Sequence, residues 1–396
     1  MTALIGMNTN IQHSTYLYGM RIGFDAKRAF RNNTGLGQYS RNLLSALFAG
    51  YPEHEYHLMT TKTSEMFPLP DADNIHVHTP GGMYKAFPAL WRSNAVRHDL
   101  RRLGVDLYHG LSHELPVGLN RTGIKTVVTM HDLIFERYPK QYKPIDVAVY
   151  RKKFRYAAEH ADVVIAISRQ TRADLVDYYQ VPERKIRVCY QSCNTGFQQA
   201  VTAEAKDAVC SKYQLPERYL LSVGSVIERK NLLTVVSALH RLKGRLDIPL
   251  VVIGTGGDYM KQVKQYIKAQ GMEGQVHFIS ERPCGVAGAD MPAIYQGAHV
   301  MLYPSVFEGF GIPILEALWS SLPVVTSNLS CMPETGGDAA YYVDPLSAED
   351  MAEAIYKVST NEALRADMIA KGLVHARNFL PEQCAAAVMD VYRSLM

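Results

Sequence analysis

The sequence has little of what a membrane-spanning, secreted or fibrous protein needs. Nowhere in its 396 residues do 18 apolar residues follow one another, so we expect no membrane-spanning helix. Residues 1–19 lack the basic start and apolar stretch of a secretion signal, so we interpret them as an extension and expect a cytoplasmic protein. The composition, 47% hydrophobic and 20% charged, is that of a globular chain and excludes disorder, collagen and coiled coil.

Cysteine pairs and metal-ligand clusters are also missing. The six cysteines are scattered and form no Cys-x-x-Cys pair, which indicates reduced thiols and neither a disulfide framework nor a zinc site. We find no cluster of acids or histidines with the spacing of a divalent-metal site. The sequence therefore predicts no metal and no cofactor.

Positive charge is unevenly distributed along the chain. The net charge is +4, yet residues 84–156 hold 14 Lys and Arg against 6 Asp and Glu. Two interpretations stay open for this basic belt, whose centre is Arg151, Lys152, Lys153 and Arg155. It is either a solvated helix face or a surface for peripheral attachment to an anionic membrane or a phosphorylated acceptor. Nucleic acid is not an expected partner, because no nucleic-acid-binding module accompanies the charge.

Strands and helices alternate throughout, which is typical of parallel sheets with crossover helices. At 396 residues the chain is long enough for two such domains. The α/β pattern therefore predicts two Rossmann-like domains facing across a cleft, with ligands outside the carboxyl ends of the strands. Strands are expected at 21–25, 57–61, 75–78, 105–109, 125–131 and 162–167, then at 219–224, 249–254, 275–280, 299–304 and 323–327.

We place the domain boundary in residues 194–208, which are polar and show no strong period. The expected organisation is an extension at 1–19, a first Rossmann-like domain at 20–197, a second at 198–378 and a final helix at 379–396. Helices are expected at 37–50, 89–104, 145–160 and 168–179, then at 231–244, 257–271, 290–297, 311–321, 347–360 and 362–378.

The sharpest motif is Glu-Gly-Phe-Gly-Ile-Pro-Ile-Leu-Glu at residues 308–316, where a strand runs into a glycine-rich loop that opens a helix. Such a loop presents backbone N–H groups and the positive end of a helix to an anion. Glu308 lies in the loop and Glu316 more than one turn into the helix, so they can reach different parts of one elongated ligand. A plain helix start with acidic residues is the alternative.

A second motif is Glu228-Arg229-Lys230-Asn231, which follows a strand and precedes a helix. Adjacent Arg and Lys side chains at this position can bind a diphosphate. On spacing alone, a solvated helix start is an equally simple interpretation.

Together these motifs resemble the signature of family 4 retaining, nucleotide-sugar-dependent glycosyltransferases of the GT-B fold, from about Met20 to the end of the chain. The matching run is Tyr303-Pro304-Ser305 followed by residues 308–316, with His299 where the family often has Asp. The resemblance implies that Arg229 and Lys230 hold the donor's phosphates, as in mannosyltransferase-like members, although Ser225 stands where many members carry Arg. It also implies that Glu308, Gly309, Phe310 and Gly311 contact the donor and that Glu316 holds the ribose.

Three places in the first half agree with the resemblance. Residues 33–39 resemble the family's first-domain glycine loop, which makes Gly35 and Gly37 candidate donor-binding residues. The stretch Thr129-Met130-His131-Asp132 resembles the family's His-Asp element, in which the histidine approaches the donor sugar. Acceptor candidates at strand ends are Asp25, His109 and His113.

The expected function is therefore a retaining glycosyltransferase that moves a hexose of the mannose or glucose type. The donor is a nucleoside diphosphate sugar and the acceptor a glycan or a lipid-linked sugar, with His131 and Glu308 at the reacting centre. Two alternatives stay open: a sugar epimerase or phosphorylase of the same fold, and a non-catalytic nucleotide-sugar or glycan-binding protein. The sequence leaves the donor base and sugar undecided.

Overall fold

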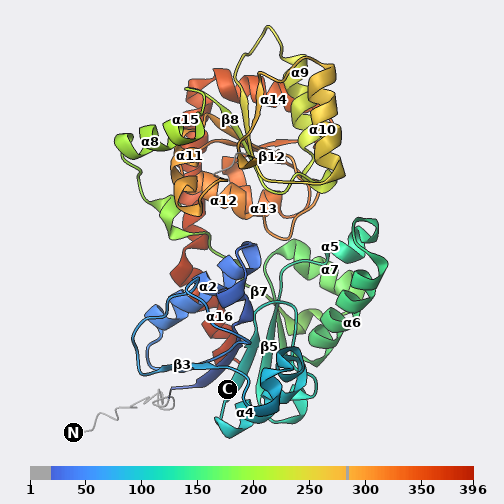
Figure 1. Ribbon diagram of the computed structural model, residues 1–396, viewed down its shortest axis with the longest axis vertical. Coiled ribbons are helices and arrows are strands. Elements are labelled where there is room, and N and C mark those ends of the chain that lie inside the picture. The colour runs from blue at the N-terminus through green and yellow to red at the C-terminus, as the bar shows by residue number, and fades with distance from the viewer. Residues whose placement is uncertain (1–18, 282–284) are drawn as a thin grey trace, which may run out of the picture.

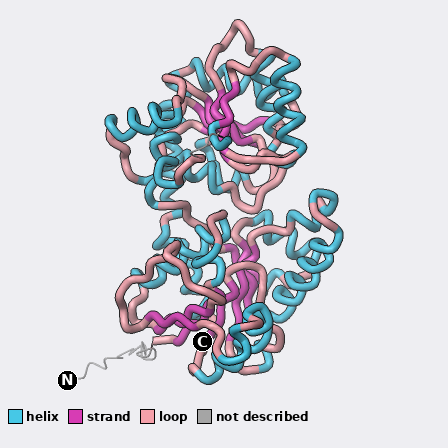
Figure 2. The backbone as a smooth tube through the Cα atoms, viewed as in Figure 1, coloured by secondary structure: helices cyan, strands magenta, loops and turns pink. Residues whose placement is uncertain are grey.

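The computed structural model describes residues 19–281 and 285–396, so most of the expected extension and Cys284 lie outside the described residues. The chain forms two α/β domains, one above the other (Figure 1). In each, strands run through the middle and helices cover both sides (Figure 2). None of the helices in the described ranges combines the length and apolar character needed to cross a membrane.

The first domain contains a parallel sheet in the order β3-β2-β1-β4-β5-β6-β7. Its strands are β1 (Arg21–Asp25), β2 (Glu55–Met59), β3 (Ile75–His78), β4 (Leu107–Gly110), β5 (Lys125–Met130), β6 (Val163–Ala166) and β7 (Ile186–Val188). The longer helices are α2 (Gly35–Gly50), α4 (Val96–Arg102), α6 (Pro144–His160) and α7 (Arg169–Tyr179). Short helices are α1 (Lys27–Arg31), α3 (Pro88–Leu90) and α5 (Ile134–Arg137).

The second domain repeats this architecture with a parallel sheet in the order β10-β9-β8-β11-β12-β13. Its strands are β8 (Leu220–Val223), β9 (Leu250–Ile253), β10 (Val276–Phe278), β11 (Val300–Tyr303), β12 (Val324–Ser327) and β13 (Tyr341–Val343). Its helices are α8 (Ala203–Tyr213), α9 (Leu232–Arg241), α10 (Asp258–Ala269), α11 (Met291–Gly297), α12 (Ile312–Trp319), α13 (Met332–Gly336), α14 (Ala348–Thr360) and α15 (Glu362–Ala376).

Each sheet carries an apolar core on both faces, as expected for strands read as continuous apolar runs. On the first sheet, one core includes Leu44 of α2 and the other includes Phe154 of α6. On the second sheet, one core includes Leu315 of α12 and the other Val236 of α9. These cores fix the directions of the strands, whose carboxyl ends carry the motifs.

The last helix, α16 (Pro381–Arg393), lies beside α2 in the first domain, although it follows the second domain in sequence (Figure 1). Its buried residues Ala385, Val388, Met389 and Tyr392 join the core on that side of the first sheet. These residues recur at helical spacing and give α16 one apolar face. The chain therefore joins the two domains twice.

The structure contains elements that the sequence did not indicate. Residues 194–208, where we placed the domain boundary, include the start of α8, and the Thr202 side chain caps this helix by accepting a hydrogen bond from the N–H of Ala205. The strands β7 and β13 were not expected, since three residues are too few to show a period. The helix expected at 89–104 is interrupted by a π-helical turn, η2 (Trp91–Ala95), between α3 and α4.

Candidate active site

Glu308 and the Arg229–Lys230 pair meet at the carboxyl ends of two neighbouring strands of the second sheet. Arg229 and Lys230 belong to the short helix η7 (Glu228–Lys230) after β8, and Glu308 follows β11. Glu308 Oε1 lies 2.9 Å from Arg229 Nη1 and 2.7 Å from Lys230 Nζ. Lys230 Nζ also donates to the Tyr303 hydroxyl at 2.6 Å. One carboxylate therefore holds both cations of the predicted phosphate clamp in place.

The two cations determine the charge state of Glu308. Burial alone would raise the pKa of Glu308, but Lys230 and Arg229 lower it to about 2. Burial would likewise lower the pKa of Arg229, yet Glu308 raises it above its ordinary value. All three groups are charged at neutral pH, so this ion triad carries one net positive charge. It is suited to bind an anion.

The glycine-rich loop between β11 and α12 contacts the first domain. A Cβ atom on Gly309 would lie 2.2 Å from the carbonyl oxygen of His131, so only glycine permits this approach. Gly311 precedes α12 with φ of 89°, a left-handed conformation that also favours glycine. The Phe310 side chain is buried in the core against Phe379. Its contact with the donor stays a prediction.

His131 directly follows β5 and is the first-domain residue whose carbonyl oxygen lies against Gly309. Its Nε2 lies 2.9 Å from the carbonyl oxygen of Leu111, and a nitrogen must carry the proton to donate to a carbonyl. Burial lowers the pKa of His131 to about 4, so the ring is neutral at pH 7 and Nδ1 is unprotonated. His131 can therefore accept a hydrogen bond from a hydroxyl group but does not serve as a cation.

The other two histidine candidates make structural contacts, and their assignment to the acceptor stays a prediction. His109 is fully buried, and its ring nitrogens lie 2.6 Å from the Tyr392 hydroxyl and 2.7 Å from that of Thr129. His113 Nε2 accepts a hydrogen bond from the backbone N–H of His131, and its ring stacks on Phe154. A strand end in the sequence does not reveal whether its side chain points into the core.

Glu316 is the second acid of the motif and differs from Glu308 in its surroundings. It lies on α12 and accepts a hydrogen bond from the Tyr295 hydroxyl at 2.8 Å. Burial raises the pKa of Glu316 to about 7, and the Tyr295 bond offsets only part of this effect. Its carboxyl group therefore changes charge near neutral pH, unlike that of Glu308.

The first-domain glycine loop supplies one open glycine. A side chain on Gly35 would meet nothing within 4 Å, and α2 starts at this residue. The N–H of Gly37 already donates to Asn32 Oδ1 at 3.1 Å and to the Thr34 carbonyl at 3.0 Å. A Cβ there would lie 1.8 Å from the Asn32 carbonyl oxygen. Gly37 therefore shapes the loop, and its contact with the donor stays a prediction.

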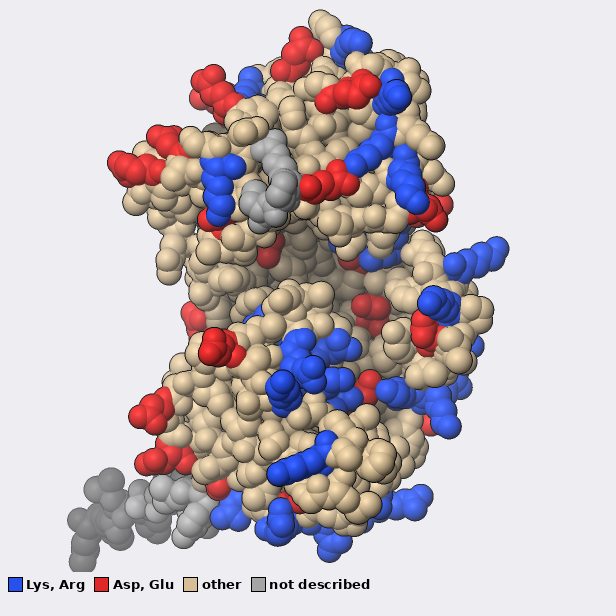
Figure 3. All heavy atoms as spheres, viewed as in Figure 1, with Lys and Arg blue, Asp and Glu red and all other residues tan. Residues whose placement is uncertain are grey.

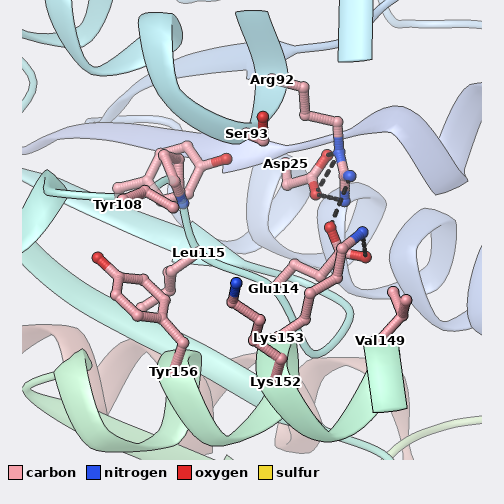
Figure 4. A pocket seen from close by; sticks show the side chains of 12 residues that line it. Asp25, Arg92, Ser93, Tyr108, Glu114, Leu115, Val149, Lys152, Lys153 and Tyr156 are labelled. Carbon is pink, nitrogen blue, oxygen red and sulfur yellow. Dashed lines mark hydrogen bonds and ion pairs between the residues drawn. The ribbon is translucent and has the colours of Figure 1, made fainter. Parts of the chain in front are cut away.

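Asp25 forms a contact that sequence reasoning missed. Its two carboxylate oxygens accept hydrogen bonds from Nε of Arg92 at 3.0 and 2.9 Å. Arg92 Nη1 also donates to Glu114 Oε2 at 2.8 Å, and Lys153 Nζ lies 3.4 Å from Glu114 Oε1. These side chains border a cavity of about 490 Å³ in the first domain (Figure 4). Arg92 was visible in the sequence only as one member of a basic stretch.

The basic belt does not consist of four free cations. Arg151 pairs with Glu136 at 2.6 Å, and Lys153 with Glu114. The Arg155 guanidinium lies over the Tyr179 ring at 5.2 Å from its centre. Intramolecular partners therefore engage three of the four side chains, and attachment of this belt to a membrane stays a prediction.

Two further contacts join the domains, and the sequence did not single them out for this role. The Glu334 carboxylate accepts hydrogen bonds of 2.9 Å from the backbone N–H of Arg169, the first residue of α7. An acid is stabilised at that positive helix end. The Arg137 guanidinium lies 4.8 Å from the ring centre of Phe307. Figure 3 shows a hollow between the two domains.

Within 19–281 and 285–396, no group of three or more His, Cys, Asp and Glu is arranged to hold a metal ion. The site described above contains the side chains of Arg229 and Lys230, and such cations can stabilise developing negative charge.

Comparison with known proteins places this geometry in a family. Residues 33–196 match the model of Glycosyltransferase Family 4, and residues 210–374 match Glycosyl transferases group 1, so the two matches together cover most of the chain. O-antigen chain mannosyltransferase B of Escherichia coli is 27% identical over 377 residues, which are 91% of this chain and 96% of the relative.

Two solved structures share the fold. A glycosyltransferase from Rickettsia africae superposes with a TM-score of 0.71 at 17% identity, over 96% of this chain and 99% of the other. Alr3699/HepE of Anabaena, in complex with UDP and glucose, also superposes with a TM-score of 0.71. Its sequence is 15% identical, and the superposition covers 95% of this chain and 100% of the other. The chain therefore belongs to the glycosyltransferases of the GT-B fold, with a family 4 first domain and a group 1 second domain.

Proposed function

We propose that this glycosyltransferase transfers a hexose, with retention of configuration, from a nucleoside diphosphate sugar to a glycan or lipid-linked acceptor in polysaccharide synthesis. Arg229 and Lys230, held by Glu308 opposite His131, are the observation that carries the proposal. Mannose is the preferred choice of sugar, because the relative that aligns over nearly its full length is named a mannosyltransferase.

The donor's diphosphate would bind at the ion triad. Its charge complements the net positive charge of Arg229, Lys230 and Glu308, and the two cations stabilise the diphosphate as it leaves. The ammonium of Lys230 is the more adaptable of the two, since Arg229 is buried and also donates to the Phe307 carbonyl. Glu308 then has two tasks: it orders the clamp and its remaining oxygen accepts from donor sugar hydroxyls.

The sugar and ribose would be held by the groups around the clamp. The unprotonated Nδ1 of His131 accepts a hydrogen bond from a sugar hydroxyl. Glu316 accepts from the ribose hydroxyls, which favours its ionised form. The bond between the anomeric carbon and the diphosphate oxygen breaks while the acceptor oxygen attacks the same face. The acceptor's proton passes to the departing diphosphate.

Metal independence and a cytoplasmic location complete the proposal. A guanidinium and an ammonium can balance a diphosphate without a divalent ion. The five cysteines in the described part of the chain are free, which agrees with a reducing compartment.

The decisive experiment incubates the full chain with a panel of nucleoside diphosphate sugars and measures the release of nucleoside diphosphate, with and without glycan acceptors. We expect release with GDP-mannose that acceptor stimulates and that a strong chelator leaves unchanged. The anomeric configuration of the product, read by NMR, tests retention. Failure of every donor, or an inverted product, would contradict the proposal.

A further inference from the structure

We propose that the first-domain cavity binds a phosphorylated amphiphile, a molecule with one phosphate group next to an apolar chain. This inference rests on the proposed function in one respect, because it names such an amphiphile as the carrier of the acceptor. The cavity measures about 490 Å³, which is within the usual range for small-molecule sites. It lies between the π-helical turn η2, the loop after β4 and the helix α6.

The wall of the cavity is mostly apolar and well fixed. Leu115, Pro116 and Val117 line one side, and Val149 and the Tyr156 ring line another. The Tyr156 hydroxyl accepts a hydrogen bond from the N–H of Gly118 at 2.7 Å, which ties the loop to α6. An apolar chain in this cavity would gain the free energy of leaving water without rearranging the wall.

Lys152 gives the cavity its charge. Its ammonium points into the space between Tyr156 and the Arg92 network (Figure 4). Arg92 is balanced by Asp25 and Glu114, and Glu114 also pairs with Lys153. Among the residues that the structure describes, Lys152 Nζ has no hydrogen-bond or ion-pair partner. The charged side chains lining the cavity therefore leave one net positive charge, which complements a single anionic group.

Exposed apolar side chains continue outward from this cavity. Val117 and Val149, which line it, are 49% and 45% exposed. Ile145 lies one helical turn before Val149 on α6 and is 70% exposed, and Leu90 directly before η2 is 56% exposed. Side chains four residues apart lie on the same helix face. Contiguous exposed apolar surface marks a binding site, and here it extends the apolar wall beyond the cavity.

The π-helical turn gives a local reason for this geometry. Such turns are rare and occur often at functional sites. Here the turn contains both Arg92 and Ser93, which line the cavity, while Trp91 packs inward and its Nε1 donates to Asp99 at 2.7 Å. The Ser93 carbonyl accepts from the N–H of Val117 at 2.7 Å. The turn therefore positions the cation network and the apolar loop together.

The test measures binding of decyl phosphate, below its micelle concentration, to the full chain by isothermal titration calorimetry without any nucleotide sugar. We expect saturable binding with one site. Lys152→Ala should weaken it at least tenfold, and Val149→Asp should do the same by placing a negative charge in the apolar wall. The matched control Lys143→Ala removes a cation just before α6 that does not line the cavity, and should leave binding unchanged.

Two ligand controls separate the sources of affinity. Inorganic phosphate and decanol should each bind at least tenfold more weakly than decyl phosphate. Equal binding of inorganic phosphate would mean that the cavity takes free phosphate, and equal losses in Lys152→Ala and Lys143→Ala would indicate general surface charge. Either result, or no saturable binding by the wild type, would overturn the inference. Nucleoside diphosphate release by the same preparation tests the proposed function separately.

Discussion

Replacing Glu308 by Gln removes the one negative charge between two cations while keeping the shape of the side chain. The pKa of Glu308 is lowered from 4.5 to about 2, although burial acts in the opposite direction. This difference corresponds to roughly 3 kcal/mol of stability at neutral pH. Breaking a buried pair typically costs about 3–5 kcal/mol, but Lys230 is partly exposed and can turn toward water. We therefore expect Glu308→Gln to lower the free energy of unfolding by about 2–3 kcal/mol at pH 7.

The pH dependence has a definite sign. Because the folded-state pKa is lowered, the stability that Glu308 contributes is present above pH 4.5 and is lost as the pH falls through about 2. The difference in the free energy of unfolding between wild type and Glu308→Gln should therefore shrink to about half of its pH 7 value by roughly pH 3. Urea unfolding at pH 7 and at about pH 3 measures this difference. The control is Glu228→Gln, an exposed acid next to Arg229 in η7, for which we expect a change below about 0.5 kcal/mol.

The same variant separates structure from chemistry. Its turnover should fall at least a hundredfold, because a charged contact that is strengthened in the transition state is lost. Binding of the bare nucleoside diphosphate should not fall, because Arg229 and Lys230 lose their internal counterion. Wild-type stability together with near wild-type turnover would refute the reasoning from the ion triad.

Three further predictions concern the clamp, the second acid and the last helix. Lys230→Ala should weaken nucleoside diphosphate binding by about 1.5–3 kcal/mol in calorimetry and bare nucleoside binding far less; equal losses would contradict a phosphate contact. Because the pKa of Glu316 is raised in the folded state, the stability that its carboxyl group contributes is present below pH 4.5 and is lost as the pH rises through about 7. The free energy of unfolding from urea titrations, Glu316→Gln minus wild type, should therefore be larger at pH 8 than at pH 5 by on the order of 2 kcal/mol. An equal difference at the two pH values would contradict this. Met389→Ala should lower the stability of the first domain by about 2–5 kcal/mol in thermal unfolding, whereas exposed Glu382→Ala should not; an unchanged melting temperature would show that α16 is not docked.

The sequence alone was sufficient for the repeating α/β pattern and for the place of the main motifs. Apolar runs mark most strands, and the parallel arrangement follows from the helices between them. Glu308 and the Arg229–Lys230 pair could be expected close together, because both follow strands whose carboxyl ends meet at one sheet edge. The short strands β7 and β13 and the π-helical turn could not, since they depend on neighbours that the local sequence does not specify.

Only the tertiary structure decided which of the polar candidates are available to a ligand. His109 and His131 lie at the carboxyl ends of neighbouring strands, yet the Tyr392 hydroxyl from the last helix bonds His109, whereas the carbonyl oxygen of His131 lies against Gly309 of the second domain. Asp25 and Arg92 are 67 residues apart and form an ion pair because η2 packs across the end of β1. The partner of a charged side chain is set by the elements packed around it. Local sequence can therefore name the cations of a site, but only the packing shows which of them are already neutralised.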